Sequence, residues 1–233
     1  MSKPYNDHVW FWPPRTKARL PWGDDVVLPI WRNFPDVVAQ YKLDGNRNMI
    51  FVSPERKVTF WNRKLDKITG QPYQQNYEIQ TPLLDKILAI APEKQWTVFD
   101  TELMHTKGGG YVKNTIYLYD VLVWYSQHLQ GTSYADRYTI IENLGLPILP
   151  LLGKEATQVE RGEALGNHNI YLAQNILPAD WDKAWKQVRR CDFIEGLVLK
   201  RTGPVSRLEY GSSEYNNSGW MLRVRKAKKN YVN

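Results

Sequence analysis

Residues 41–47 read YKLDGNR, and this stretch sets a lysine at the end of an apolar strand and directly before a turn. The first strand is predicted over VVAQYKL, residues 37–43, and the next over RNMIFVS, residues 47–53. A lysine on the surface needs no such setting, because an ammonium is seldom buried unless it is paired or used. A lysine that must lose its proton and attack an electrophile does need one. We therefore interpret Lys42 as a candidate nucleophile.

The pattern outward from this stretch predicts an α+β fold in which a largely antiparallel sheet, or a pair of sheets, is flanked by helices. Residues 1–35 are rich in Trp and Pro and are expected to wrap the domain in irregular or extended form. The two strands around YKLDGNR are predicted to be consecutive antiparallel strands, and a helix is predicted to start at Thr81. Further strands are predicted over residues 57–63, 96–104, 115–124, 193–201 and 219–226, and further helices over residues 133–145 and 181–190.

Charge and composition favour a polyanionic partner. The 233 residues carry 31 Lys and Arg against 24 Asp and Glu, a net charge of +7, and the isoelectric point is near 9.3. The alternative interpretation of this charge is a well-solvated basic surface. The single cysteine, Cys191, excludes an internal disulfide framework and fits a reducing cytoplasm. The N-terminus has no secretory signal pattern, and no apolar run approaches the roughly 18 residues of a membrane span.

Six charged residues interrupt strands that otherwise look buried. A single charge of this kind is explained by the alternation of a half-buried strand, which faces every second residue to solvent. Six charges spread over three strands instead indicate a shared site, because buried charges are usually paired or bound to a ligand or metal. These residues are Lys42, Asp44, Asp100, Glu102, Glu195 and Lys200.

The order of short motifs along residues 36–226 resembles that of the covalent nucleotidyltransferases, the superfamily of ATP-dependent DNA ligases, RNA ligases and messenger RNA capping enzymes. KLDGNR resembles the K-x-D-G-x-R nucleophile motif of this superfamily, and EGLVLK is a near-complete match to its fourth motif. The run SGWMLRVR resembles the closing K-x-K motif of short bacteriophage DNA ligases. The other matching segments are Asn62-Arg63, FDTEL (99–103), YLYDVL (117–122) and ADRYTIIENL (135–144).

The resemblance implies the nucleotidyltransferase fold of DNA ligase adenylation domains and a role for each matched residue. Lys42 would attack the α-phosphorus of ATP and carry the AMP, with Asp44 and Arg47 completing the catalytic motif. An ordinary lysine, with a pKa of about 10.4, is protonated near neutral pH. Neighbouring cations, desolvation and a bound Mg²⁺ or Mn²⁺ would lower that pKa. The resemblance implies nucleotide binding by Arg63, Glu102, Tyr119, Lys200, Arg223 and Arg225, with Tyr119 against the purine, and metal binding by Glu102 and Glu195.

The motifs also depart from the pattern of the superfamily. Thr101 stands where the acidic motif usually has glycine, and Arg223 and Arg225 stand where the closing motif usually has lysines. The run Lys226-Ala227-Lys228 offers a second register for the closing pair. Glu195 and Lys200 are five residues apart on one predicted strand, so a bulge or twist is required if both side chains are to point inward.

Three segments are expected along the chain. They are an N-terminal segment packed on the domain (residues 1–35), a nucleotidyltransferase, or adenylation, domain (36–226) and a basic tail (227–233). No OB-fold domain is expected after the tail, although ligases and capping enzymes usually continue into one. Nucleic-acid contacts are expected at Arg47, Lys226, Lys228 and Lys229, because cationic side chains supply most of the affinity for phosphate backbones.

The sequence predicts an ATP-dependent DNA ligase that seals nicks between 5′-phosphate and 3′-hydroxyl ends in duplex DNA, through lysyl-AMP and a DNA-adenylate. This activity belongs to DNA repair or replication. Arg47 and the SGW before the closing motif favour DNA, whereas the missing OB-fold domain keeps an RNA ligase acting on RNA ends as the main alternative. A GTP-dependent capping guanylyltransferase ranks third, and a non-catalytic nucleic-acid-binding domain fourth. A monomer with no membrane partner is expected, in the cytoplasm of a bacterial or phage-infected cell.

Overall fold

Strands dominate the computed structural model, which describes residues 12–23, 27–65, 72–75, 79, 81–107, 112–149, 169–211 and 216–226. They are β1 (Arg19–Pro21), β2 (Val37–Leu43), β3 (Asn46–Val52), β4 (Val58–Leu65), β5 (Pro72–Gln75), β6 (Thr97–Lys107), β7 (Val112–Trp124), β8 (Gln127–His128), β9 (Ile170–Leu172), β10 (Ile194–Arg201) and β11 (Met221–Arg225). The helices are α1 (Val27–Arg32), α2 (Thr81–Ile90), α3 (Tyr134–Glu142) and α5 (Trp181–Arg190), with short 3₁₀ turns at Pro178–Asp180 and Pro204–Ser206.

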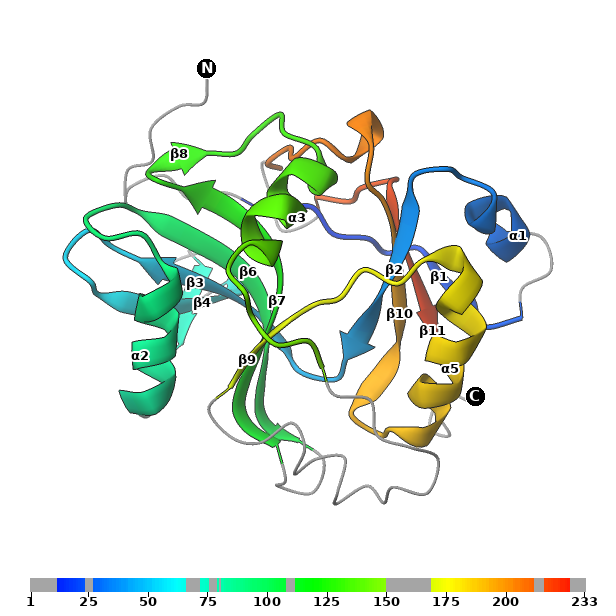
Figure 1. Cartoon of the computed structure of the whole chain (residues 1–233), viewed down its shortest axis with the longest axis horizontal. Helices are drawn as coiled ribbons and strands as arrows, with labels where there is room; N and C mark the ends of the chain where they lie inside the picture. The colour runs from blue at the N-terminus through cyan, green and yellow to red at the C-terminus, as the bar shows by residue number, and fades with distance from the viewer. Residues whose placement is uncertain are drawn as a thin grey trace.

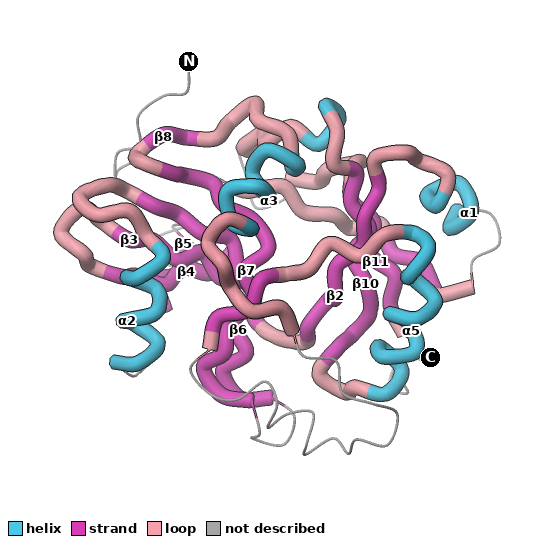
Figure 2. Tube along the Cα trace, in the orientation of Figure 1, coloured by secondary structure: helices cyan, strands magenta, loops and turns pink. Residues whose placement is uncertain are grey.

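The strands form two sheets, and the helices lie outside them (Figure 1, Figure 2). A four-stranded sheet has the order β1-β11-β10-β2, and a seven-stranded sheet has the order β5-β4-β3-β6-β7-β8 with β9 paired to β7. Within the described ranges, only the β1–β11 and β7–β9 pairs are parallel. The expected α+β class with mainly antiparallel sheets and flanking helices is therefore confirmed.

The turn after Lys42 carries the chain from one sheet to the other. The sequence predicts β2 and β3 as consecutive antiparallel strands, but β2 pairs with β10, and β3 pairs with β4 and β6. Asp44 and Gly45 are the two residues between them. The Asp44 N–H donates to the Phe193 carbonyl oxygen at 2.8 Å. A Cβ atom on Gly45 would lie 2.8 Å from the Leu103 carbonyl oxygen and from side-chain atoms of two neighbours, so only glycine fits here.

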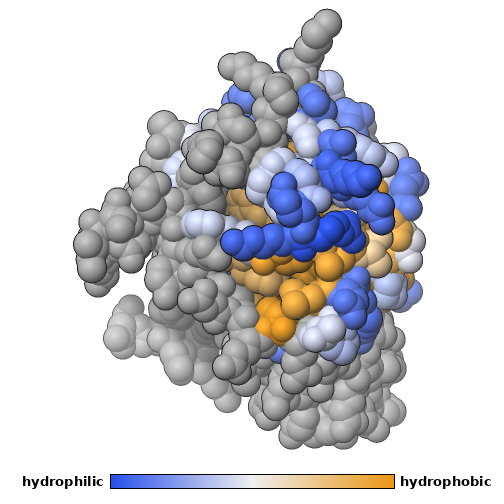
Figure 3. Space-filling view, turned by 90° about the vertical axis from the view of Figure 1, so that its left-hand side faces the viewer, coloured by the Kyte–Doolittle hydropathy of each residue, from blue (hydrophilic) through white to orange (hydrophobic). Residues whose placement is uncertain are grey.

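The described residues form three hydrophobic clusters, two of which contain residues from both sheets. The helix α5 covers the four-stranded sheet (Figure 1). Its residues Trp181, Trp185 and Val188 recur at helical spacing and are buried. The helices α2 and α3 cover the seven-stranded sheet, and both contribute to its core. Leu84 and Leu88 of α2 are only partly buried. The face of the molecule that carries α2 shows hydrophobic residues beside hydrophilic ones (Figure 3). No helix among the described residues is long and apolar enough to cross a membrane.

Helix α3 begins as its sequence predicts. Ser133 accepts a hydrogen bond from the Asp136 N–H, and the Asp136 side chain accepts one from the Ser133 N–H, which makes a capping box. Gly145, beyond the end of the helix, has a φ of +66°. The helix α1 was not predicted, because its six residues lie in a segment interpreted as irregular. The expected basic tail, residues 227–233, lies outside the described residues.

Arg137 of α3 ties this helix to β7 through a buried ion pair. Its Nε and Nη2 atoms donate to the two oxygens of Asp120 at 2.8 and 2.9 Å, and Nη1 donates to the Thr132 carbonyl oxygen at 2.7 Å. The arginine side chain is fully inaccessible to solvent. Replacing one partner of such a pair with an uncharged residue leaves the other as an uncompensated buried charge.

We predict that Arg137→Met lowers the free energy of unfolding by about 3–5 kcal/mol, because the Asp120 carboxylate loses its partner. Urea denaturation followed by tryptophan fluorescence measures the change. Asp182→Asn is the matched control, since it breaks the exposed pair that Asp182 makes with Arg32 at 2.8 Å. That loss should stay below about 1 kcal/mol. Equal losses in the two variants would contradict the assignment.

Candidate active site

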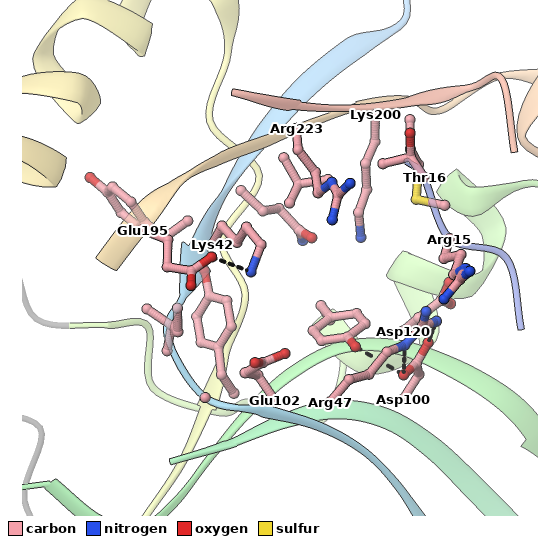
Figure 4. Close-up of a pocket in the computed structure, with 18 of the residues that line it drawn as sticks. Arg15, Thr16, Lys42, Arg47, Asp100, Glu102, Asp120, Glu195, Lys200 and Arg223 are labelled. Carbon is pink, nitrogen blue, oxygen red and sulfur yellow. Dashed lines mark hydrogen bonds and ion pairs between the residues drawn. The ribbon is translucent and has the colours of Figure 1, made fainter. Parts of the chain in front are cut away.

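A cavity of about 720 Å³ lies where the two sheets face each other. Its walls come from β2, β10 and β11 on one side and from β3, β6 and β7 on the other, and residues 14–17 close a third side. Figure 4 shows charged side chains from all of these segments gathered around one space. Of the residues expected to act, the cavity is lined by Lys42, Arg47, Glu102, Tyr119, Glu195, Lys200, Arg223 and Arg225.

Lys42 is held by Glu195 on the neighbouring strand. Its Nζ lies 2.8 Å from Glu195 Oε2, and an Nη2 atom of Arg225 lies 2.8 Å from the same oxygen (Figure 4 draws the Lys42 pair). The register explains this arrangement. Gly196 is opposite Lys42 on β2 and opposite Arg225 on β11, so Glu195 stands between the two cations.

A bulge makes this geometry possible. The pairing of β10 with β2 shifts between Ile194 and Gly196, which leaves Glu195 as the extra residue. The required bulge is therefore present, and both Glu195 and Lys200 line the cavity. A Cβ atom on Gly196 would lie 2.0 Å from the Val224 carbonyl oxygen, so the close approach of β11 requires glycine.

The neighbours of Glu195 keep its carboxylate ionised near neutral pH. Burial by itself would raise the pKa of Glu195, but a hydrogen bond with Asp44 and the charges of Lys42 and Arg225 outweigh it and lower the pKa to about 2. Asp44 thus contacts the site through Glu195. The nucleophile candidate and the neighbouring carboxylate form a paired, partly buried cluster.

The facing wall carries a second paired cluster, centred on Asp100. Arg47 donates from Nε to Asp100 Oδ1 at 2.9 Å and from Nη2 to Oδ2, and the Tyr119 hydroxyl donates to Oδ1 at 3.0 Å. Tyr119 also occupies a bulge, because Asp100 pairs with Asp120 while Thr101 pairs with Leu118. The Asp100 carboxylate therefore orients the arginine and the aromatic ring that the motifs single out.

Glu102 lacks such a dominant partner. Burial raises the pKa of Glu102, Lys42 and Arg47 oppose the rise, and Glu195 and Asp100 add to it, so that the pKa is about 7. Its neighbour Thr101, which replaces the usual glycine, turns away from the cavity and donates its hydroxyl to the Asn48 carbonyl oxygen at 2.8 Å. Glu102 is thus poised to change charge near neutral pH.

Lys200 places an ammonium deep in the cavity, with only 5% of the residue exposed. Its Nζ lies 4.3 Å from the ring centre of Tyr134 and 5.2 Å from that of Tyr119, in cation–π contact with both. Burial lowers the pKa of Lys200 to about 8, although Asp120 and Asp100 favour the charged form. Asp120 is already paired with Arg137, and Asp100 with Arg47.

The two possible registers of the closing motif differ in where their side chains lie. Arg223 and Arg225 line the cavity, and the Arg223 guanidinium points inward (Figure 4). The Lys226 ammonium instead donates to the carbonyl oxygens of Val188 and Cys191 at 3.2 and 2.8 Å, at the end of α5. Lys226, the first residue of the second register, therefore does not face the cavity. Lys228, Lys229 and the Arg63 side chain lie outside what the structure describes.

The acidic groups fit a magnesium ion shared with a ligand. Among the described residues, no group of three or more His, Cys, Asp and Glu side chains is placed to hold a metal by itself. Mg²⁺ usually takes one or two carboxylates and completes its shell with water and phosphate oxygens. Glu195 supplies an anionic carboxylate, and Glu102 lies near enough for the Glu195 charge to act on its pKa.

Sequence reasoning missed several residues of the cavity. Gln40 is two positions before Lys42, so the period of a strand places it on the same face, and this signal was available. Its Nε2 donates to the Ala173 carbonyl oxygen at 2.7 Å and to the Tyr134 hydroxyl at 2.7 Å. Arg15, Thr16 and Lys17 carry no comparable signal, because their place depends on contacts with segments far along the chain.

The chain has the fold of DNA ligase nucleotidyltransferase domains. The ligase domain of LigD from M. tuberculosis aligns over 81% of this chain and 53% of its own length, with a TM-score of 0.51 and 15% identity. A mycobacterial DNA ligase D complexed with ATP and MES aligns over 81% and 54%, with a TM-score of 0.51 and 16% identity. A structure named Pmar-Lig_Pre aligns over 89% and 46%, with a TM-score of 0.51 and 15% identity.

This chain spans about half the length of those solved structures. By sequence, no family model and no curated protein matches it. The likeness in structure therefore concerns the fold, and the chemistry must be argued from the residues themselves.

We predict that Glu102→Gln stabilises the protein above neutral pH. The folded pKa of about 7 exceeds the ordinary value of 4.5, so the stability contributed by protonated Glu102 is complete below pH 4.5 and is lost as pH rises through 7. Glutamine cannot ionise and keeps that stability. The difference in free energy of unfolding should grow to at most about 3 kcal/mol at pH 8, as screening by solvent reduces it.

Urea denaturation of both proteins between pH 4 and pH 8 measures this difference. The comparison at pH 4 is the internal control, where the two should agree. If the free energies of unfolding of the two proteins differ by the same amount at every pH, Glu102 does not titrate near neutrality.

Proposed function

We propose that this chain is the catalytic domain of an ATP-dependent polynucleotide ligase that joins nicked DNA through Lys42. The observation that carries the proposal is the Lys42–Glu195–Arg225 cluster at the edge of a cavity walled by Tyr119 and Arg47. A lysine nucleophile needs an electrophile delivered to it and cations to stabilise the charge that develops. The cavity offers both a binding space and the cations.

The first step would be transfer of AMP to Lys42. The Nζ atom, after losing a proton, attacks the α-phosphorus of ATP, a P–N bond forms, and the P–O bond to pyrophosphate breaks. Arg225 and Arg223 line the same wall and would compensate the charge of the phosphates. Glu195 contacts Lys42 and Arg225 through a single oxygen, so a phosphate bound to Arg225 would compete with this carboxylate for the guanidinium.

The facing wall would bind the nucleoside. Tyr119 is a partly buried aromatic ring fixed by its hydrogen bond to Asp100, which suits it to pack against a purine. Arg47 is fixed by the same carboxylate. Lys200, buried at the inner end, and Glu102 would contact polar groups of the nucleotide, as the motifs imply.

A divalent cation would be held by Glu195 and Glu102 together with phosphate oxygens. When bound, Mg²⁺ or Mn²⁺ would compensate the charge of the triphosphate and make pyrophosphate a better leaving group. ATP rather than GTP is supported by the ligand named with the mycobacterial ligase D. In the following steps, the 5′-phosphate of the nick would take AMP from Lys42, and the 3′-hydroxyl would then displace AMP.

DNA is the preferred polynucleotide in this proposal. The structures that share the fold include a ligase domain and a DNA ligase by name. The net charge of +7 favours a polyanion of either kind. Because a nick has no set sequence, recognition would rest on phosphate contacts rather than on base edges.

We predict that Lys42→Ala abolishes covalent attachment of nucleotide. The parent should retain label from α-³²P-ATP and Mg²⁺ after denaturation, and the variant should retain less than about 1% of it, because Lys42 is the proposed acceptor of the covalent bond. Lys57→Ala is the matched control, since this lysine is exposed and outside the cavity. Full labelling of the Lys42 variant would remove the lysine from its role.

We also predict that nicked duplex DNA is sealed in preference to single-stranded or nicked RNA. Binding should weaken steeply with salt, with a log–log slope of about −0.9 for each phosphate neutralised. Gel assays of joining, run across a salt series with each substrate, measure both quantities. Preferential joining of RNA ends would overturn the DNA assignment and favour an RNA ligase. Labelling by GTP but not ATP would favour a capping enzyme.

A further inference from the structure

A strap of N-terminal chain, residues 12–21, lies against the cavity although none of the motifs includes it. In Figure 1 it runs from the middle of the molecule to β1. Backbone hydrogen bonds attach it along its length. The Gly211 N–H donates to the Trp12 carbonyl oxygen at 3.0 Å, and the Ser218 N–H to that of Arg15 at 2.7 Å. Beyond these, β1 pairs in parallel with β11.

Two carbonyl groups of the strap hold the arginines of opposite walls. The Pro14 carbonyl oxygen accepts a hydrogen bond from Arg47 Nη2 at 2.9 Å. The Lys17 carbonyl oxygen accepts one from Arg223 Nη2 at 2.9 Å. Arg47 belongs to β3 in the seven-stranded sheet, whereas Arg223 belongs to β11 in the four-stranded sheet. The strap therefore bridges the two sheets through the side chains that line the cavity between them.

These contacts add to the restraint on two long side chains, of which Arg47 is also paired with Asp100. A hydrogen bond from a charged donor is stronger than one between neutral groups, and a free arginine side chain loses rotamer entropy when it is ordered. A guanidinium already oriented by a carbonyl loses less when it binds phosphate. Residues 14–17 also line the cavity themselves, so a bound ligand would meet the strap directly.

We propose that the strap is a positioning element of the nucleotide site. The carbonyl groups of Pro14 and Lys17 hold Arg47 and Arg223 in place for the phosphates of a nucleoside triphosphate, and binding of those phosphates in turn orders the strap. This inference rests on the proposed function for the identity of the ligand. The coupling is reciprocal, because a ligand that binds better when the strap is closed must favour the closed strap.

Limited proteolysis of the full chain tests the coupling without relying on activity. Lys17 and Arg19 are exposed, and trypsin cleavage after either one requires the strap to open locally. The Lys42→Ala variant is used so that no covalent adduct forms. ATP with Mg²⁺ should slow cleavage in the strap about fivefold or more, whereas adenosine, which lacks phosphates, should not. Cleavage after the exposed Lys94 is the control and should not change.

Truncation tests the positioning role in the reaction. A chain that starts at residue 19 keeps β1 but loses both carbonyl groups, and its KM for ATP in self-labelling should rise about tenfold or more. A chain that starts at residue 12 is the matched control and should keep the parent KM. Circular dichroism shows whether the shorter chain folds. If it does not, the proteolysis result decides.

Equal cleavage rates with ATP and with adenosine, or an unchanged KM in the shorter folded chain, would overturn the positioning role. A parent chain that takes no label from any nucleotide would overturn the proposed transfer reaction instead. In that case, protection of the strap by ATP would still support the coupling, and its absence would still refute it.

Discussion

The geometry of the cavity depends on the passage between sheets at Asp44 and Gly45. Two residues are enough to take the chain from β2 to β3, and the packing of Glu102, Leu103 and Met104 against Gly45 leaves no room for a side chain there. As a result, Lys42 and Arg47 are close in sequence but lie on different walls. Any ligand that spans the cavity meets both ends of one short motif.

Several charges in and beside the cavity are held in ion pairs. Asp100 holds Arg47, Asp120 holds Arg137, and Glu195 holds both Lys42 and Arg225. Among the described residues, Glu102 and Lys200 have no ion-pair partner, and burial moves the pKa of each toward neutrality, to about 7 and about 8. Buried charges without partners are costly unless a ligand compensates them. The two buried charges therefore fit a site that binds a charged ligand.

Irregular pairing places two of the most important side chains. Glu195 and Tyr119 each occupy the extra position of a β-bulge, one in each sheet. A regular strand would alternate strictly, and Glu195 and Lys200 would then face opposite sides. Bulges are a common means of directing a side chain into a site, and here they act on both walls. The strap adds a third irregular element, because it holds arginines from the two walls with backbone carbonyls.

Local sequence alone determined most of the strands and helices and the α+β class. Apolar runs predicted β2, β6, β7 and β10, and the helix-start signal at Thr81 predicted α2. It also placed Lys42 at the end of a strand, directly before the turn. Only the tertiary structure decided that β2 and β3 separate into two sheets and that Arg223 and Arg225, rather than Lys226, face the cavity. It also decided that residues 14–17 close that cavity. The reason is physical. Periodicity and capping act over a few neighbouring residues, whereas strand partners, ion pairs and the place of the strap depend on contacts between segments up to about two hundred residues apart.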